Sequence, residues 1–172
     1  VQWSLTGNYT ATKVTKIAAN PPQLAGVSLF DLTAIDNLET TAPKFRAVAA
    51  GLWTWGAFSV NAKETLYGPA HRHDSRTGCS LATGASSPTC FDNRIKTTLI
   101  TDLELAYKLF DGSTKVSIGA NNLFNKFPNK LNPDYRNTFL VGNANGYVTQ
   151  YPTFSSFGIN GGYYYVRLAW SF

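Results

Sequence analysis

Two histidines near the middle of the chain are the first candidates for chemistry. His71 and His73 lie two residues apart, so on a strand their imidazoles would share a face and could ligate a metal ion. Two ligands are too few for a stable site, and Asp74 is the neighbour that could add a third. The sequence therefore favours an exposed loop here over a metal centre, and we expect no cofactor.

The two cysteines lie close together in the chain. Cys79 and Cys90 fall within one stretch rich in Ser, Thr, Gly and Pro. Their spacing is too wide for a Cys-x-x-Cys zinc or redox motif. The simplest interpretation is a local disulfide formed in an oxidising compartment. If the cysteines pair, neither is available to a metal ion held by the histidines.

Paired carboxylates could indicate acid–base catalysis. Asp102 and Glu104 are two residues apart and would share a strand face. Lys96 and Lys108 would lie on the same face, which favours ion pairs instead. The sequence holds no Gly-x-Ser-x-Gly, His-Glu-x-x-His or phosphate-binding Gly-rich motif. We expect no enzymatic activity.

Basic and imidazole side chains are frequent in two long polar connections. They could attract an anionic ligand such as a metal chelate, or the phosphates of surface lipid. The alternative is that these are the ordinary charges of exposed loops. The possible ligand-facing residues are His71, Arg72, His73, Arg76, Lys126, Lys130 and Arg136.

Composition limits the class of protein. The 172 residues are 44% hydrophobic, 14% aromatic and 15% charged. Aromatic and β-branched residues are too plentiful for a disordered chain, and no run of about 20 apolar residues could form a membrane-spanning helix. The net charge is +5, but the fifteen Lys and Arg residues are spread singly, so we expect no nucleic-acid binding. These exclusions leave an all-β chain.

Polar and apolar residues alternate with a period of two in six segments, as strands between unlike media require. In residues 94–110 the leucines have one parity and the charges from Lys96 onward have the other. Such a strand is long compared with about 5 to 6 residues in globular sheets, which favours a transmembrane barrel. Lys63 and Glu64 are adjacent, so one of them must break the alternation. The predicted strands are 1–11, 44–55, 57–68, 94–110, 113–124 and 162–172.

Short and long connections alternate along the chain. Two tight turns are predicted, Trp55-Gly56 and Asp111-Gly112, the second of type I′. The long connections are 16–43, 69–93 and 125–161. Outer-membrane barrels have short periplasmic turns and longer extracellular loops, and the alternation puts all three long connections outside. Aromatic residues near the predicted strand ends fit the interfacial girdles of a barrel, and the alternative is the core of a β-sandwich.

Two local motifs carry a family resemblance. The last strand ends in an alternating row that resembles the C-terminal signature recognised by the outer-membrane barrel assembly machinery. Upstream, Asn122-Leu123-Phe124, within residues 116–126, resembles the penultimate-strand motif of TonB-dependent receptors. The spacing of Ala42-Pro43-Lys44 and of residues 102–107 is similar to that family, whereas Gly161-Gly162-Tyr163 stands where members often carry a Gly-Arg pair. The residues of the assembly signal are Tyr164, Val166, Leu168, Trp170 and Phe172.

The resemblance implies a fold larger than this chain. Receptors of this kind have barrels of about 22 strands with a plugged lumen, and the chain offers six and has no methionine at position 1. Residues 1–172 are thus expected to be the C-terminal segment of an all-β transmembrane barrel, six antiparallel strands of an incomplete fragment. The plug domain, the TonB-binding segment and the earlier strands would lie outside it.

The same resemblance implies a function in import. The expected protein lies in the outer membrane of a Gram-negative bacterium and takes up a scarce small-molecule nutrient, by analogy a ferric siderophore or similar chelate, with energy delivered through TonB. Its other partners would be outer-membrane lipid and the barrel assembly machinery. The alternatives are a non-transporting barrel, such as an adhesin or a barrel enzyme, and a soluble secreted β-sandwich.

Overall fold

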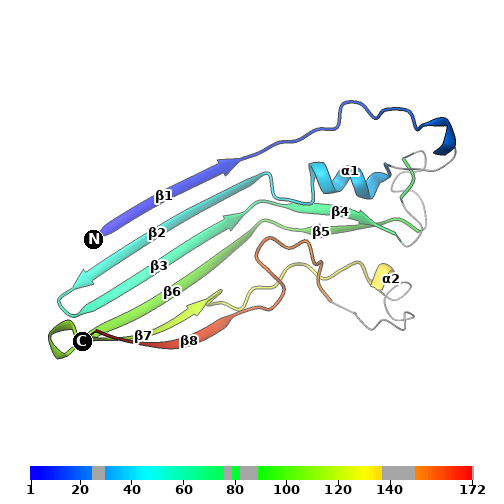
Figure 1. Cartoon of the computed structure of the whole chain (residues 1–172). Helices are drawn as coiled ribbons and strands as arrows, with labels where there is room; N and C mark the ends of the chain where they lie inside the picture. Colours follow the sequence, from blue (N-terminus) through cyan, green and yellow to red (C-terminus); the bar gives the residue numbers. More distant parts are fainter. Residues whose placement is uncertain (25–29, 76–78, 82–88, 137–149, 172) are drawn as a thin grey trace.

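The chain forms one curved, open, antiparallel sheet of six strands (Figure 1). The computed structural model describes residues 1–24, 30–75, 79–81, 89–136 and 150–171. The strand order in the sheet is β1-β2-β3-β6-β7-β8, and β1 and β8 form its two edges. The six strands fall within the six predicted segments. Their bounds are β1 (Gln2–Tyr9), β2 (Phe45–Trp55), β3 (Phe58–Tyr67), β6 (Thr98–Leu109), β7 (Thr114–Asn121) and β8 (Tyr163–Trp170).

The long connections lie at one end of the sheet and the tight turns at the other (Figure 1). The long connections contain structure that the sequence analysis did not predict. They hold the helices α1 (Leu32–Glu39) and α2 (Pro133–Tyr135), a 3-10 turn (Pro22–Leu24), and the paired strands β4 (Ala70–Asp74) and β5 (Phe91–Ile95). We call the end of the sheet with the long connections the loop end and the end with the tight turns the turn end.

The prediction of one continuous strand over 94–110 is wrong, because the segment divides into β5 and β6 around Lys96 and Thr97. The partner strand breaks at the same level, at Gly68 and Pro69. Pro69 has no N–H to donate, and the N–H of Lys96 donates to the Asn129 side chain at 2.9 Å. Tyr67 lies opposite Thr98, and Ala70 lies opposite Ile95, so the two pairs are three residues apart on each strand. The β4–β5 pair therefore continues the register of β3–β6 beyond the interruption.

Both turns differ from their predictions. Trp55 pairs with Phe58, so the first turn is Gly56-Ala57, one residue later than predicted. Gly56 has a φ of +57°, a conformation that costs glycine little. The second turn is not a two-residue type I′ turn, because Leu109 pairs with Thr114 and four residues, 110–113, connect them. Phe110 joins Asp111 in the left-handed region, which its residue type does not indicate.

The pairing register sorts the six strands into two contrasting faces. One face carries mostly apolar and small side chains, and we call it the apolar face. Its one charged residue is Glu64, whose carboxylate accepts a hydrogen bond from the Thr101 hydroxyl at 2.8 Å. Lys63 lies on the opposite face, so Glu64 is the member of the adjacent pair that breaks the alternation of polar and apolar residues. The apolar face consists of Trp3, Leu5, Gly7, Tyr9, Phe45, Ala47, Ala49, Gly51, Trp53, Trp55, Phe58, Val60, Ala62, Glu64, Leu66, Leu99, Thr101, Leu103, Leu105, Tyr107, Leu109, Thr114, Val116, Ile118, Ala120, Tyr164, Val166, Leu168 and Trp170.

The opposite face, which we call the polar face, carries the ion pairs. Lys63 lies 2.7 Å from Asp102, and Glu104 lies 3.6 Å from Arg167 and 3.9 Å from Lys115. Asp102 and Glu104 thus form ion pairs on this face, but their partners are cations of neighbouring strands and not Lys96 and Lys108, which the sequence suggested. Lys96, expected on the same strand, lies in the break before β6.

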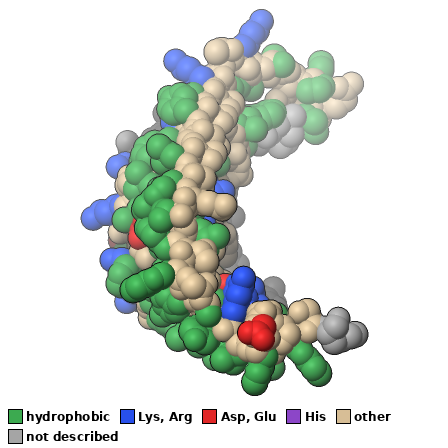
Figure 2. Space-filling model, turned by 90° about the vertical axis from the view of Figure 1, so that its left-hand side faces the viewer, with side chains coloured by type: hydrophobic (Ala, Val, Ile, Leu, Met, Phe, Trp, Pro, Cys, Tyr) green, Lys and Arg blue, Asp and Glu red, His purple; other side chains and the backbone are tan. Residues whose placement is uncertain are grey.

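Aromatic rings gather at both ends of the apolar face, with aliphatic and small residues between them. Trp53, Phe58 and Tyr107 lie near the turn end, and Tyr9 and Phe45 lie at the loop end. Figure 2 shows the molecule as an open C with hydrophobic side chains along its convex side. The face is uncovered, since Trp3, Leu5 and Val166 are 70%, 82% and 75% exposed.

Gly51 permits a close aromatic contact on this face. The rings of Trp3 and Trp53 meet edge to face, 4.5 Å between centroids, over its Cα, and a Cβ there would lie 2.8 Å from both. Gly7 lies on the same face of the neighbouring strand, and a Cβ there would meet only open space up to 4.0 Å.

We therefore expect Gly51→Val to push the two tryptophans apart and to lower the free energy of unfolding by about 1–3 kcal/mol. Gly7→Val is the matched control and should change stability by about 0.5 kcal/mol or less. Urea unfolding followed by tryptophan fluorescence, in detergent micelles, measures both. Equal stability of the two variants would contradict the close packing described for Gly51.

Candidate functional site

The loop end is held together by buried contacts between the long connections. Asp31 precedes helix α1 as its N-cap, because its side chain accepts a hydrogen bond from the backbone N–H of Ala34 at 2.8 Å. The other carboxylate oxygen accepts from the N–H of Cys79 at 3.3 Å, and the Leu32 N–H donates to the Cys79 carbonyl at 2.9 Å. The start of the helix is thereby fixed to the segment that carries Cys79.

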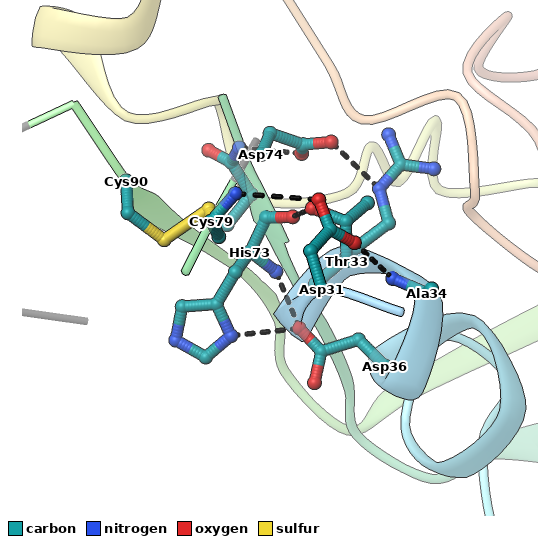
Figure 3. The surroundings of a disulfide bond; sticks show 10 residues. Asp31, Thr33, Ala34, Asp36, His73, Asp74, Cys79 and Cys90 are labelled. Carbon is teal, nitrogen blue, oxygen red and sulfur yellow. Dashed lines mark hydrogen bonds and ion pairs between the residues drawn. A yellow bond between two sulfur atoms is a disulfide. The ribbon is translucent and has the colours of Figure 1, made fainter. Parts of the chain in front are cut away.

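The structure joins Cys79 and Cys90 in a disulfide, with their Cα atoms 5.3 Å apart (Figure 3). Cys79 is fully buried and Cys90 is 8% exposed. Cys90 directly precedes β5, so the disulfide links the start of α1 to the β4–β5 pair. No sequence signal pointed to this helix contact, although Asp31 before Leu32-Thr33-Ala34 is a recognisable helix start.

His71 and His73 are half-buried on strand β4 and do not lie in the exposed loop that the sequence favoured. They share one face of the strand, and that face is turned toward α1. Asp36 of α1, 5% exposed, accepts a hydrogen bond from the His73 backbone N–H at 2.6 Å and lies 2.7 Å from its Nδ1 (Figure 3). The Thr40 hydroxyl donates to the other Asp36 oxygen at 3.2 Å. This carboxylate orients His73 and anchors the helix on the strand.

The two imidazoles lie near one another, with ring centroids 6.0 Å apart and perpendicular planes. Asp36 occupies one ring nitrogen of His73. Within the part of the chain that the structure describes, no group of three or more His, Cys, Asp or Glu side chains is placed to hold a metal ion.

The other face of β4 binds the connection between β7 and β8. Arg72 donates through Nε to Asp74 at 2.7 Å, and the Asn93 amide donates to the second Asp74 oxygen at 2.8 Å. Asn93 is 1% exposed, and its oxygen accepts the backbone N–H of Asn132 at 2.8 Å. The Asp74 carboxylate thus compensates the positive charge of Arg72. The Arg72 guanidinium also lies 4.8 Å from the ring centroid of Phe154.

A phenol belongs to the same contact region. Burial, and next the Asp74 carboxylate, raise the pKa of Tyr135, and Arg72 acts in the opposite direction. The Tyr135 ring lies 5.7 Å from that of Phe91. The neutral phenol is therefore the form retained at physiological pH.

An arginine on the polar face at the loop end was not predicted. The Arg46 guanidinium lies 5.1 Å from the ring centroid of Tyr67, and that ring is 5.7 Å from Phe157. Arg46 is exposed, and among the described residues no carboxylate lies within ion-pair distance of it. We call Arg46, Tyr67 and Phe157 the arginine platform. Its charge, unlike that of Arg72, is available to an anionic ligand.

The Asn-Leu-Phe motif forms a compact turn after β7. Asn122 is 8% exposed and has a φ of +54°, which asparagine tolerates better than most residues. Its amide donates to the Lys126 carbonyl at 2.7 Å, and its side-chain oxygen accepts the Lys126 N–H at 2.8 Å. Its own backbone N–H donates to Asp102 of β6 at 2.8 Å.

The same turn holds the start of β8. The side-chain oxygen of Asn125 accepts the Gly162 N–H at 2.8 Å, and the Tyr164 hydroxyl donates to the Leu123 carbonyl at 3.1 Å. Leu123 in turn donates through its N–H to the Thr101 carbonyl at 2.7 Å. The motif therefore joins β6, β7 and β8 at the loop end.

The remaining predicted ligand-facing residues do not converge on one site. Lys126 is part of the turn just described, Lys130 is exposed, and Arg136 ends α2 with its N–H donating to the Asn132 carbonyl at 3.0 Å. Arg76 lies outside the described residues.

The predicted assembly-signal residues lie in one row on the apolar face of edge strand β8. Tyr164, Val166, Leu168 and Trp170 are 60% to 75% exposed. Phe172 lies outside the described residues.

Comparison with known proteins adds no assignment. No family model, curated protein or solved structure shows significant similarity to the chain. Among the described residues, no helix is long and apolar enough to cross a membrane.

The turn built by Asn122 yields a test. Asn122→Ala removes two side-chain hydrogen bonds from a buried turn and leaves alanine in a left-handed conformation, so we expect the free energy of unfolding to fall by about 1–3 kcal/mol. Asn121→Ala is the matched control, because that neighbouring side chain is exposed and makes no hydrogen bond to the described residues. Urea unfolding in micelles measures both, and indistinguishable midpoints would show that the turn does not depend on Asn122.

Proposed function

We propose that the chain is the C-terminal part of a transmembrane β-barrel in the outer membrane of a Gram-negative bacterium, from a receptor of the TonB-dependent type. The observation that carries this proposal is the sorting of six strands into an uncovered apolar face with aromatic ends and a charged opposite face. Strands that cross an outer membrane alternate between lipid and lumen in this way, with aromatic girdles at both interfaces.

Strand lengths support the membrane assignment. β2, β3 and β6 have 11, 10 and 12 residues, and about 9–11 residues cross a bilayer as a tilted strand. From Phe45 to Trp53 the apolar face of β2 rises about 27 Å, which at a tilt of about 40° spans close to the height of the apolar band of such barrels.

The open edges and uncovered face disfavour a soluble β-sandwich. A sandwich would bury the apolar face under a second sheet, whereas β4 and β5, the other described strands, extend the β3–β6 pair instead. Further strands beside β1 and β8 would close the sheet into a barrel and satisfy their unpaired backbone groups.

The polar face and the loop end support a role in uptake. In the proposed barrel the ion pairs of Asp102 and Glu104 line the lumen, and the arginine platform lies at its outer mouth. An exposed, uncompensated guanidinium stacked on an aromatic ring suits a small anionic nutrient, and by family resemblance the proposed cargo is a ferric siderophore or similar chelate. TonB would act through a segment outside residues 1–172, and the assembly machinery would bind the row on β8.

The proposal predicts opposite responses to lysine on the two faces. Leu103→Lys places a charge toward lipid and should cost about 2–4 kcal/mol near the bilayer midplane, with loss of assembled protein. Asn61→Lys lies at the same depth on the polar face, opposite Glu104, and should be tolerated. Outer-membrane abundance and heat-modifiable gel mobility measure the difference. Equal tolerance would contradict the membrane assignment.

Transport is tested in cells that produce the full-length receptor. Radioactive iron supplied as catecholate, hydroxamate or citrate chelates should enter only with functional TonB for at least one chelate. Arg46→Gln should raise the concentration for half-maximal uptake roughly tenfold, as for loss of one charge-assisted contact. Lys108→Gln is the control, because Lys108 lies on the polar face near the turn end. Failure of all three chelates to show TonB-dependent uptake would contradict iron transport.

A further inference from the structure

The one charged side chain of the apolar face, Glu64, lies within the apolar band and not beyond it. Toward the loop end the same face continues with Leu66 on β3 and Leu99 on β6. Glu64 lies about 10 Å before the end of β3 at Tyr67. The Thr101 hydroxyl is 2.8 and 2.9 Å from its two carboxylate oxygens, but among the described residues no cation lies within ion-pair distance of it. A charge that faces lipid is unfavourable unless it is paired, so this carboxylate requires a partner.

A cation lies in the wall of the same depression. The depression, of about 470 Å³, opens at the loop end, and both Glu64 and Lys126 line it. The Asn122 side chain binds the backbone N–H and carbonyl of Lys126, so the turn fixes the position of the lysine. Lys126 is exposed, and no carboxylate of the described residues lies within ion-pair distance of its ammonium group. The depression therefore holds one anion and one cation that do not pair with each other.

The two charges lie on opposite sides of β6 at nearly the same level of the sheet. On one side Glu64 is opposite Thr101 of β6. On the other side the N–H of Leu123, in the turn that carries Lys126, donates to the Thr101 carbonyl at 2.7 Å. A two-fold axis along the membrane normal through β6 would exchange these two sides. Glu64 of each copy would then meet Lys126 of the other, and the flexible stem of lysine can span the height difference that strand tilt introduces.

Charge complementarity favours a second copy of the chain over other occupants of the depression. A metal ion would find a single carboxylate in its walls, and an anionic lipid that contacts Lys126 would also lie beside Glu64. A partner that satisfies both charges must present one cation and one anion, which a second copy does by symmetry. The apolar side chains of the depression are also available for contact, since Phe124, Leu99 and Phe127 are 64%, 49% and 38% exposed.

We propose that this depression is a two-fold interface between two copies of the receptor, in which Glu64 of each copy pairs with Lys126 of the other. The exposed Phe124 ring of each copy packs against the Leu99 side of the second copy, which shields both ion pairs from lipid. This inference rests on the proposed membrane function, because the membrane gives both barrels the same orientation and places the axis along its normal.

The first test is sedimentation equilibrium of the full-length receptor in density-matched non-ionic detergent. The native receptor should dimerise. Glu64→Gln keeps an oxygen for the Thr101 hydroxyl but removes the charge, and Lys126→Gln removes the opposite charge. Each substitution deletes two ion pairs per dimer, so the dissociation constant should rise about a hundredfold, at roughly tenfold per pair.

Asp111→Asn and Lys96→Gln are the matched controls, since they remove the same charges from exposed positions outside the depression. Both should dimerise as the native receptor does. An unchanged dissociation constant in Glu64→Gln or in Lys126→Gln overturns the proposal.

Charge reversal tests the pairing itself. Glu64→Lys alone and Lys126→Glu alone place like charges opposite one another and should abolish the dimer, whereas the double variant should restore it. The two single variants, produced together with different affinity tags, should co-purify from outer membranes, because each supplies the charges that the other lacks. A purely local role of Glu64 toward Thr101 predicts no such rescue, and its absence in assembled protein overturns the proposal. The glutamine variants decide the matter even where Glu64→Lys fails to assemble.

The two levels of failure are distinguishable. A receptor that is present in the outer membrane and heat-modifiable on gels, but monomeric at every concentration, overturns the interface and leaves the proposed function standing. A receptor that is absent from the outer-membrane fraction and has no heat-modifiable form refutes the membrane function itself.

Discussion

The separation of two unlike faces by the pleat of a single sheet is the constraint on which the structure depends. Successive side chains point to opposite sides, so a slip of one residue in any pairing would exchange an entire row between the faces. The close contacts of the polar face all require the observed register, since Lys63 meets Asp102 and Glu104 meets Tyr165, whose hydroxyl donates to it at 2.9 Å. The same register brings Trp3 edge to face against Trp53 over Gly51.

Buried polar side chains hold the loop end together, where the backbone hydrogen bonds between the sheet strands end. Asp36, Asp74 and Asn93 are each less than 10% exposed, and their side chains bind groups from a distant part of the chain. Asn122, 8% exposed, closes its local turn through its side chain and reaches Asp102 of β6 through its backbone N–H. Buried polar groups of this kind are costly unless they are satisfied, so they fix one arrangement of the connections. The long connections are thereby joined into a cap beyond the strands.

The sequence predicts the sheet better than the loop end. Alternation is a local signal, so the six strands and the parity of Leu103 and Asp102 can be read without knowledge of contacts. The site depends instead on pairs such as Asp36 with His73, which are 37 residues apart and belong to a helix and a strand within predicted loops. Phe110 in the left-handed region has no residue signal at all, which is why the second turn was predicted too short. The shared face of the two histidines was readable, but the carboxylate that orients one of them was not.

The interruption at Gly68 and Pro69 affects the order in which the chain can fold. For β3 to pair with β6, the residues from 68 to 97 must close a loop, and the entropy cost of closure grows with the logarithm of loop length. The β4–β5 pair lies inside that loop in the same register, and the Cys79–Cys90 link bypasses ten of its residues. An early β4–β5 hairpin would bring the ends of β3 and β6 together already aligned, so that the longer ladder could close by zipping from the loop end toward the turns.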